Sequence, residues 1–198
     1  MASIVTCFHG TTRDSALSIL DGGFRPSCNP EDWLGRGIYF FEGSERLGWV
    51  YARKAVKRAQ AAGLTAEPAL FAADIELARC IDLCDPGWSS RIRAVADRLA
   101  RDGLLERQHG LRLATAAGKT MVLADYDMEP DTFRKNLSDC RVIDALWVST
   151  AAREFEPQSV RAPFAFGKQN CLNSFFFDQS HIQISVSDVS VIHDLRLV

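Results

Sequence analysis

The sequence lacks a large excess of charge of either sign. It carries 23 Lys and Arg residues against 25 Asp and Glu residues, which gives a formal net charge of −2. Bulk charge therefore does not indicate a nucleic-acid or membrane partner, although it is compatible with a local basic patch. The chain also lacks a run of the roughly 18 apolar residues that cross a membrane, and its N-terminus has no basic, apolar secretory signal. We expect a cytoplasmic protein with no membrane partner, or one delivered into another cell by a signal-independent route.

Spacings typical of metal and nucleotide sites are missing as well. Cys80 and Cys84 are the only close cysteine pair, and neither a second pair nor a histidine completes a zinc site. We expect reduced thiols and no metal. The stretch Gly35–Gly37 lacks the full dinucleotide fingerprint and precedes a strand instead of following one. Gly118–Thr120 lacks the first glycine of a phosphate-binding loop. The remaining cysteines, also expected to be reduced, are Cys7, Cys28, Cys140 and Cys171. The histidines that lack metal-ligand spacing are His109, His181 and His193.

The composition that is present is typical of one globular domain spanning residues 1–198. Hydrophobic residues make up 47% of the chain and charged residues 24%, and a chain of this size buries roughly 70% of its extended surface. Apolar and turn patterns predict an α+β fold with strands at both ends and a helical middle. Expected strands cover 3–8, 37–41, 69–83, 141–149, 160–166, 174–177 and 181–186; expected helices cover 13–20, 44–62, 89–100, 117–127 and 130–137.

The most informative pattern lies within residues 8–52. The apolar strand 3–8 ends in His9-Gly10, and the chain then enters a short helix that is closed by two glycines. Next come Arg25 and the stretch Gly35-Arg36-Gly37-Ile38-Tyr39-Phe40, and then a helix that carries Tyr51. Each feature alone is common in surface turns or cores. Their order together resembles the start of the diphtheria-toxin/PARP class of ADP-ribosyltransferase domains.

This resemblance implies a split β-sheet core with flanking helices, and NAD as co-substrate. In the family, the histidine hydrogen-bonds a ribose hydroxyl and the glycine backbone pairs with the nicotinamide carboxamide; here these are His9 and Gly10. A glycine suits a close backbone approach to a flat ligand, and a neutral imidazole can both donate and accept. Tyr39 and Tyr51 are expected to stack on the nicotinamide ring, since a planar cation between aromatics gains on the order of 1–2 kcal/mol.

The resemblance also implies NAD contacts by residues other than the histidine, glycine and tyrosines. Arg25 matches a family arginine near the diphosphate or adenosine, and its guanidinium fork suits phosphate oxygens. Thr11 is a further hydroxyl contact to NAD. Thr12 either adds another such contact or caps the next helix.

The third motif of the family is where the chain departs from it. A glutamate on a late strand normally bonds the nicotinamide-ribose hydroxyl. In His181–Val186 the alternation places His181, Gln183 and Ser185 on one face, so Gln183 stands in the glutamate position. The same alternation is also typical of a strand face turned to solvent. Glutamine can hydrogen-bond the hydroxyl but carries no charge, and a carboxylate from elsewhere could serve instead; the nearest in sequence are Asp178, Glu154 and Glu156.

The implied activity is mono-ADP-ribosyl transfer from NAD to a protein or nucleic-acid acceptor, by a toxin, defence or effector enzyme of bacterial type. Catalytic roles are expected for His9, Tyr39 and Gln183. The alternatives are an NAD glycohydrolase and a non-catalytic NAD or ADP-ribose binding module. An RNA 2′-phosphotransferase of related fold would need basic residues in place of Tyr39. The arginines of the helical middle form either a basic face or an ordinary solvated one; they are Arg91, Arg93, Arg98, Arg101, Arg107 and Arg112.

Overall fold

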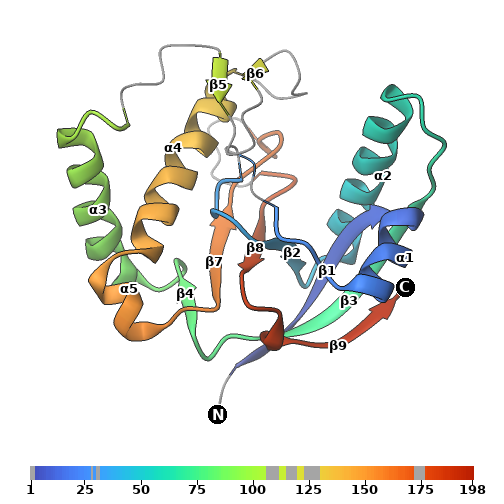
Figure 1. Ribbon diagram of the computed structural model, residues 1–198, viewed down its shortest axis with the longest axis horizontal. Coiled ribbons are helices and arrows are strands. Elements are labelled where there is room, and N and C mark those ends of the chain that lie inside the picture. The colour runs from blue at the N-terminus through green and yellow to red at the C-terminus, as the bar shows by residue number, and fades with distance from the viewer. Residues whose placement is uncertain are drawn as a thin grey trace. The chain divides into compact units, whose positions relative to one another are not determined.

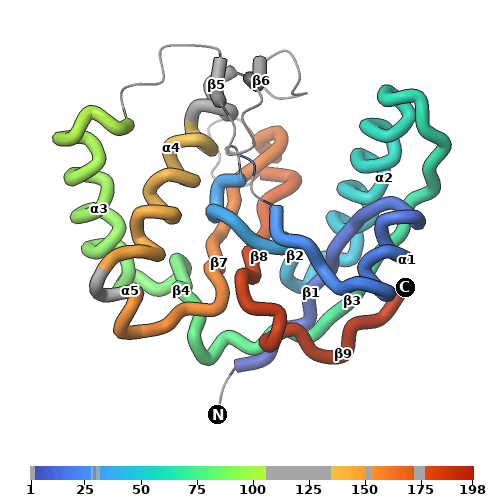
Figure 2. Tube along the Cα trace, viewed as in Figure 1, coloured from blue at the N-terminus to red at the C-terminus, as the bar shows by residue number. Residues whose placement is uncertain are grey.

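The computed structural model describes residues 3–27, 29, 32–105, 112–114, 120–122, 130–171 and 177–198 (Figure 2). These residues group into two compact units. The first unit comprises Met1–Pro26, Ile38–Cys84 and Gln158–Val198, and the second comprises Ser27–Gly37 and Asp85–Pro157. In the described part of the chain, no helix has both the length and the apolar character needed to cross a membrane.

A seven-stranded sheet forms the centre of the first unit, in the order β4-β7-β8-β2-β1-β3-β9 (Figure 1). All neighbouring strands are antiparallel except the parallel pair β4–β7. The α+β class expected from the sequence is confirmed. The strands are β1 (Ile4–Thr12), β2 (Ile38–Glu42), β3 (Pro68–Glu76), β4 (Cys80–Asp82), β7 (Ser159–Phe164), β8 (His181–Val186) and β9 (Ile192–Leu197).

One face of this sheet carries the main apolar core. Its fully buried residues come from four neighbouring strands and include Cys7, Phe40, Ile75 and Ile184. Helix α1 (Arg13–Gly22) covers part of the same face through Ala16, which packs with Ala69 and Phe71. Of the two roles expected for Thr12, the structure shows the cap: its hydroxyl accepts from Ser15 N at 3.3 Å. Gly23 ends the helix at a φ of 77°.

The opposite face lies against helix α2 (Glu45–Ala61), which Ser44 caps as the sequence predicts. The approach is close because two glycines meet there. A Cβ on Gly10 would lie 2.0 Å from Gly48 O and 2.6 Å from Ala52 N, while one on Gly48 would lie 2.5 Å from Leu70 Cδ1. The packing of α2 on β1 therefore requires glycine at position 10, whereas a side chain at position 48 would have to displace the end of the Leu70 side chain.

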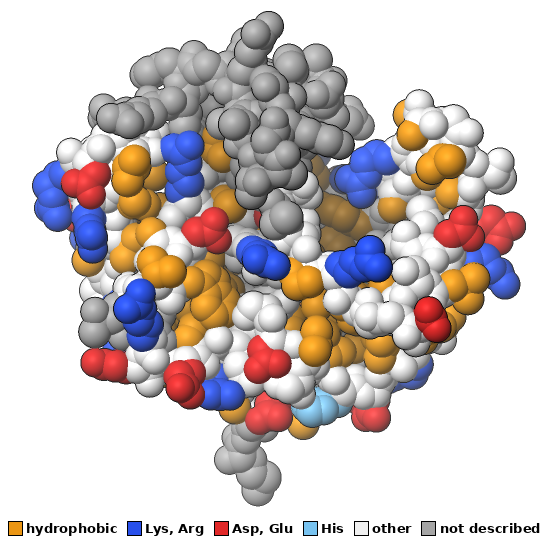
Figure 3. All heavy atoms as spheres, in the orientation of Figure 1, with side chains coloured by type: hydrophobic (Ala, Val, Ile, Leu, Met, Phe, Trp, Pro, Cys, Tyr) orange, Lys and Arg blue, Asp and Glu red, His pale blue; other side chains and the backbone are white. Residues whose placement is uncertain are grey.

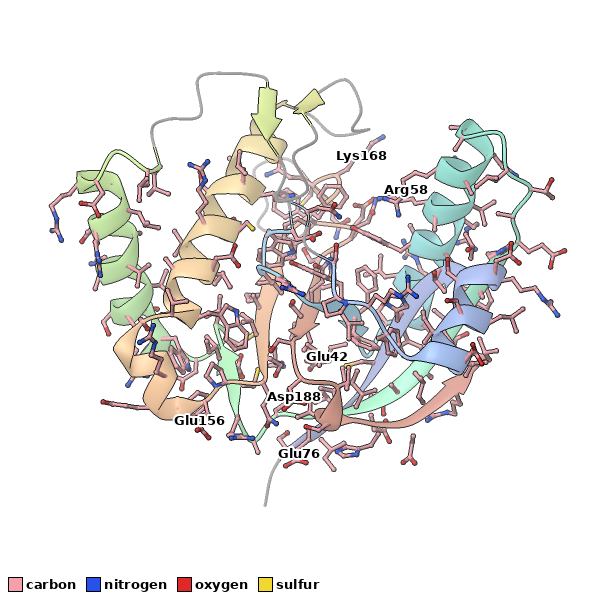
Figure 4. All side chains as sticks on the ribbon, viewed as in Figure 1. Glu42, Arg58, Glu76, Glu156, Lys168 and Asp188 are labelled. Carbon is pink, nitrogen blue, oxygen red and sulfur yellow. The ribbon has the colours of Figure 1, made fainter. Side chains whose placement is uncertain are left out.

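A partly buried ionic network ties together strands on the core face. Arg161 on β7 is paired with Glu42 on β2 through Nε–Oε2 (2.6 Å) and Nη2–Oε1 (2.8 Å), and with Asp82 on β4 at 2.9 Å. Its side chain is 16% exposed. Figure 4 labels Glu42 at the end of β2. Paired carboxylates raise the pKa of Arg161, so the guanidinium stays charged.

The chain after β8 is fixed by a second polar contact. Asp188 accepts from Gln158 Nε2 at 2.8 Å and from Ser190 N at 3.0 Å. These bonds, that from Gln158 first, lower the pKa of Asp188 to about 2. The turn through η3 (Val189–Val191) is thereby joined to the residue that precedes β7. Figure 4 labels Asp188 beside this turn.

The second unit is mainly helical. It holds η1 (Pro86–Trp88), α3 (Ser89–Arg101), α4 (Pro130–Trp147), α5 (Thr150–Phe155) and the two-stranded ladder of β5 (Arg112–Ala114) and β6 (Thr120–Val122). Leu137, Ile143 and Leu146 on α4 are buried. Trp88 packs edge-on against Phe155 with ring centroids 5.5 Å apart.

Several sequence expectations need correction. The first strand does not end before His9 but runs to Thr12, because β3 continues to pair with it up to Thr12↔Pro68. Residues 141–147 belong to helix α4 and are not a strand; their apolar positions Ile143 and Leu146 form one helical face. The helix expected at 117–127 is contradicted at Thr120–Val122, which is strand β6. Of the expected strand 174–177, residues 174–176 lie outside the described residues. The single domain over 1–198 stays a prediction.

Candidate functional site

His9 is held in a single tautomer by its surroundings. Nδ1 lies 2.8 Å from the carbonyl oxygen of Tyr39, and because a carbonyl can only accept, Nδ1 carries the proton. Nε2 is then a lone-pair acceptor, and no hydrogen-bond partner for it occurs among the described residues. The ring packs against Phe24 and Phe40 with centroids 5.3 and 5.5 Å away. Burial lowers the pKa of His9, partly offset by the Tyr39 bond, so the imidazole is neutral near pH 7.

The sheet separates beside this histidine. The β1–β3 ladder runs the full length of β1, whereas the β1–β2 ladder is confined to Cys7↔Glu42 and Phe8↔Phe41. Beyond Phe8, the imidazole of His9 supplies the hydrogen bond that a strand neighbour would otherwise give to the Tyr39 carbonyl. His9 therefore lies at a split between the two halves of the sheet.

Tyr39 and Gln183 share the face that lies under α2. Tyr39 pairs with Ser185, and Phe41 pairs with Gln183, so these four residues point to one side of the pleat. The His9 side chain points to the other side, since its neighbour Phe8 is paired with Phe41. The three predicted catalytic residues thus come from three adjacent strands, but His9 reaches Tyr39 only at its backbone.

Gln183 is buried, with 5% of its surface exposed. The alternative of a polar strand face turned to solvent is therefore wrong for this residue. Its amide nitrogen lies 2.8 Å from His181 Nε2, and its side chain also hydrogen-bonds Tyr51 on α2. Burial raises the pKa of Tyr51, while the nearby Arg58 charge and the Gln183 bond act in the opposite direction. Of the predicted site residues, Tyr51 and Gln183 are the two whose side chains the structure brings into contact.

Aromatic rings surround this pair. The Tyr51 ring lies 4.5 Å from Phe41, and His181 lies 5.2 Å from Phe41 and 5.4 Å from Phe164. The ammonium of Lys54 lies 4.5 Å from the centroid of the Tyr51 ring. A lysine cation therefore occupies one face of the tyrosine that the sequence predicts to stack on nicotinamide.

Positive charge gathers on the C-terminal half of α2, which carries Lys54 and Arg58. Lys54 also lies 5.8 Å from the ring of Phe166, in the segment after β7. Figure 4 shows Arg58 on α2 and Lys168 on that segment at the same end of the view. In Figure 3 the surface beside α2 is hollowed, with hydrophobic side chains at the bottom of the hollow. An apolar floor with cations beside it suits a planar ring attached to phosphates.

The remaining predicted ligand residues have less specific surroundings. Gly10 is required by α2, as described above, so its presence needs no ligand to explain it. Thr11 is half-buried and lies opposite Ala69 in the β1–β3 ladder. Arg25 is exposed, and within the described ranges its side chain has no ion pair or hydrogen bond.

The candidate substitute carboxylates belong to two different units. Asp178 accepts from Lys168 N at 2.9 Å and thereby closes a turn. Glu154 and Glu156 belong to the second unit, and both are exposed. Among the residues that the structure describes, no group of His, Cys, Asp or Glu side chains could hold a metal ion.

Comparisons with known proteins give no relative of this chain. A scan against protein-family models, a search of curated proteins and a search of solved structures each return no match. Any functional assignment therefore rests on the residues of the chain itself.

Sequence reasoning missed several members of the site. The alternation of strand 181–186 puts His181 on the polar face but does not indicate its hydrogen bond to Gln183. Their i, i+2 spacing places the two side chains next to each other on that face. Lys54 comes after Tyr51 by about one helical turn, a spacing that could have indicated their contact. Nothing in the sequence indicates that Phe24 and Phe40 enclose His9, because their meeting depends on strand pairing.

Proposed function

We propose that the chain is a mono-ADP-ribosyltransferase, which cleaves the nicotinamide–ribose bond of NAD and transfers ADP-ribose to a protein or nucleic-acid acceptor. The split sheet is, in this proposal, an ADP-ribosyltransferase-like core. The observation that carries the proposal is the hydrogen bond from His9 to the Tyr39 carbonyl at the point where β1 and β2 part. It joins the first two motifs, and β8 adds Gln183 on the next strand.

Each residue has a role that its surroundings support. His9 presents an unprotonated Nε2 to a ribose hydroxyl. Tyr39, on the sheet face under α2, and Tyr51, on α2 itself, are there to stack with the nicotinamide ring. Lys54 has to leave the Tyr51 ring before the nicotinamide ring can stack on it. The buried hydroxyl of Ser185, opposite Tyr39, has no partner within the described ranges and offers a further hydrogen bond to a ligand. Arg58 and Arg25 supply positive charge for the diphosphate.

Gln183 replaces a carboxylate with a neutral amide, which limits the chemistry. An amide can accept from the nicotinamide-ribose hydroxyl, but it cannot act as a general base, whose help is worth about 10²–10⁴ in rate. We therefore expect slow turnover or an acceptor that is already a good nucleophile. Elongation to poly(ADP-ribose) is not expected.

The uncharged amide also favours a second candidate, a module that binds NAD without turnover. Water as acceptor would instead make the chain an NAD glycohydrolase. These functions share one site and differ in the fate of NAD once it is bound.

The test uses the full chain with NAD labelled in its adenylate part, together with a cell lysate divided into protein and nucleic-acid fractions. Nicotinamide release is monitored in parallel. The transferase proposal expects label in one fraction, lost in His9→Ala and Gln183→Ala and kept in Gln60→Ala, an exposed position on α2. Nicotinamide without labelled acceptor would indicate a glycohydrolase. Binding without either product would indicate the binding module, and no binding at all would refute all three.

A further inference from the structure

His181 has a hydrogen bond at each ring nitrogen. Nδ1 contacts the carbonyl oxygen of Gln179, and Nε2 lies 2.8 Å from Nε2 of Gln183. The carbonyl accepts, so Nδ1 must carry the proton, and in a neutral imidazole Nε2 is then the acceptor. The amide nitrogen of Gln183 is therefore the donor in the second bond.

This bond selects one of the two orientations of the Gln183 amide. With the nitrogen directed at His181, the carbonyl oxygen Oε1 is turned away from the imidazole. The opposite orientation would bring Oε1 and the lone pair of Nε2 together, two acceptors without a proton between them. The imidazole is itself held between the rings of Phe41 and Phe164, so the ring nitrogen to which the amide donates has a fixed position.

We propose that His181 is a positioning residue, which holds the Gln183 amide so that Oε1, and not the amino group, faces the nicotinamide-ribose hydroxyl of NAD. This inference rests on the proposed function. Oε1 carries the negative end of the amide dipole and accepts from the hydroxyl, which helps a ribose centre that becomes positive as nicotinamide leaves. A reversed amide would direct the positive end of its dipole at the same centre.

The arrangement requires a neutral imidazole. The rings of Phe41 on β2 and Phe164 on β7 pack against His181, Gln183 on its own strand hydrogen-bonds it, and the charge of Lys54 on α2 acts on it. Lys54 is the charged one among them. Burial lowers the pKa of His181, the hydrogen bond to Gln179 partly offsets this, and the Lys54 charge lowers the pKa by a smaller amount. Below that pKa, Nε2 becomes a donor and the amide has to turn.

The first test needs no NAD. Long-range proton–nitrogen NMR spectra of the full chain at pH 7 should show His181 protonated at Nδ1 and unprotonated at Nε2. The Gln183 side-chain amide signals should shift when His181 titrates, at a pH below the ordinary histidine value of about 6.5. An imidazole protonated at Nε2 at pH 7 would overturn the proposal, and this result is independent of whether NAD is turned over.

The second test measures turnover. His181→Phe keeps a ring between Phe41 and Phe164 but removes the acceptor. We expect kcat for nicotinamide release to fall about tenfold, the upper range for one hydrogen bond, with a smaller change in KM. In the native chain, kcat should decline at low pH because His181 and His9 both take up protons. In His181→Phe, only the decline caused by His9 should remain. The control is His193→Phe on β9, an exposed histidine near Glu76.

A double-mutant cycle separates positioning from folding. A carboxylate presents an oxygen in either orientation, so His181→Phe should cost less than about twofold in the Gln183→Glu background. Equal losses in both backgrounds would show a merely structural role and overturn the proposal. Absence of NAD turnover in every variant would refute the proposed function, and the NMR result would still decide the orientation of the amide.

Discussion

The two faces of the central sheet are built from the same strands but carry side chains of different character. On β8, Ile184 and Val186 enter the apolar core, whereas their neighbours Gln183 and Ser185 are buried under the opposite face. Burying a polar group costs free energy unless it is hydrogen-bonded. The core face therefore explains the stability of the unit, and the α2 face retains polar groups that stability alone does not require.

The largest effect expected on the core face is from Phe40→Ala. Phe40 is fully buried and packs against His9 and Phe24, so its truncation should lower the free energy of unfolding by about 3–5 kcal/mol. Gln183→Ala on the other face should cost about 1–3 kcal/mol, because it leaves two partners unsatisfied. Urea unfolding monitored by circular dichroism measures both. An equal or greater loss in Gln183→Ala would contradict the division between the faces.

The contact of β1 with α2 is tested by Gly10→Ala. The added Cβ would meet helix backbone at 2.0 Å, and we expect a loss of about 1–3 kcal/mol in stability. Gly22→Ala is the matched control, since a Cβ there meets nothing within 4 Å. A Gly10 variant as stable as the control would show that the glycine serves something other than packing.

The partial burial of His9 makes stability depend on pH. Its folded pKa lies below the ordinary value of 6.5, so the unfolded chain takes up the proton first as pH falls. Stability should therefore be complete above about pH 6.5 and decline below it, with a slope of at most about 1.4 kcal/mol per pH unit from this group. Between pH 7.5 and 5, the free energy of unfolding from urea titrations should fall more steeply for the native chain than for His9→Gln. Equal slopes for the two chains would show that His9 titrates alike in the folded and unfolded states.

The smallest effect concerns Lys54. If its ammonium occupies the place of the nicotinamide ring on Tyr51, Lys54→Met should strengthen NAD binding by about two- to fivefold, the value of an exposed cation–π contact. Titration calorimetry gives the dissociation constants. Lys57→Met, an exposed lysine on the same helix, controls for the loss of charge, and weaker binding by the Lys54 variant would show that its charge holds NAD.

Local sequence signals predict much of the first unit. The caps at Thr12 and Ser44, the glycine stop at Gly23 and the alternation of His181–Val186 are all confirmed, because each depends on neighbouring residues. The strand expected at 141–149 is wrong for the part that lies in helix α4, since a short apolar run has no decisive period. The contacts of the site could not be predicted in the same way. His9 with Tyr39, and Tyr51 with Gln183, meet only through strand order and helix packing between distant segments.

The central claim is that the face under α2, together with His9, binds NAD. The most direct test is to titrate the isotope-labelled full chain with NAD and observe the protein by NMR. The account predicts shifts in the Gln183 side-chain amide, the His9 imidazole and the backbone of Tyr39 and Tyr51, with little change at Ile75 in the core. Shifts confined to another region, such as the depression lined by Pro86, Arg93 and Asp97 in the second unit, or no shifts at saturating NAD, would contradict it.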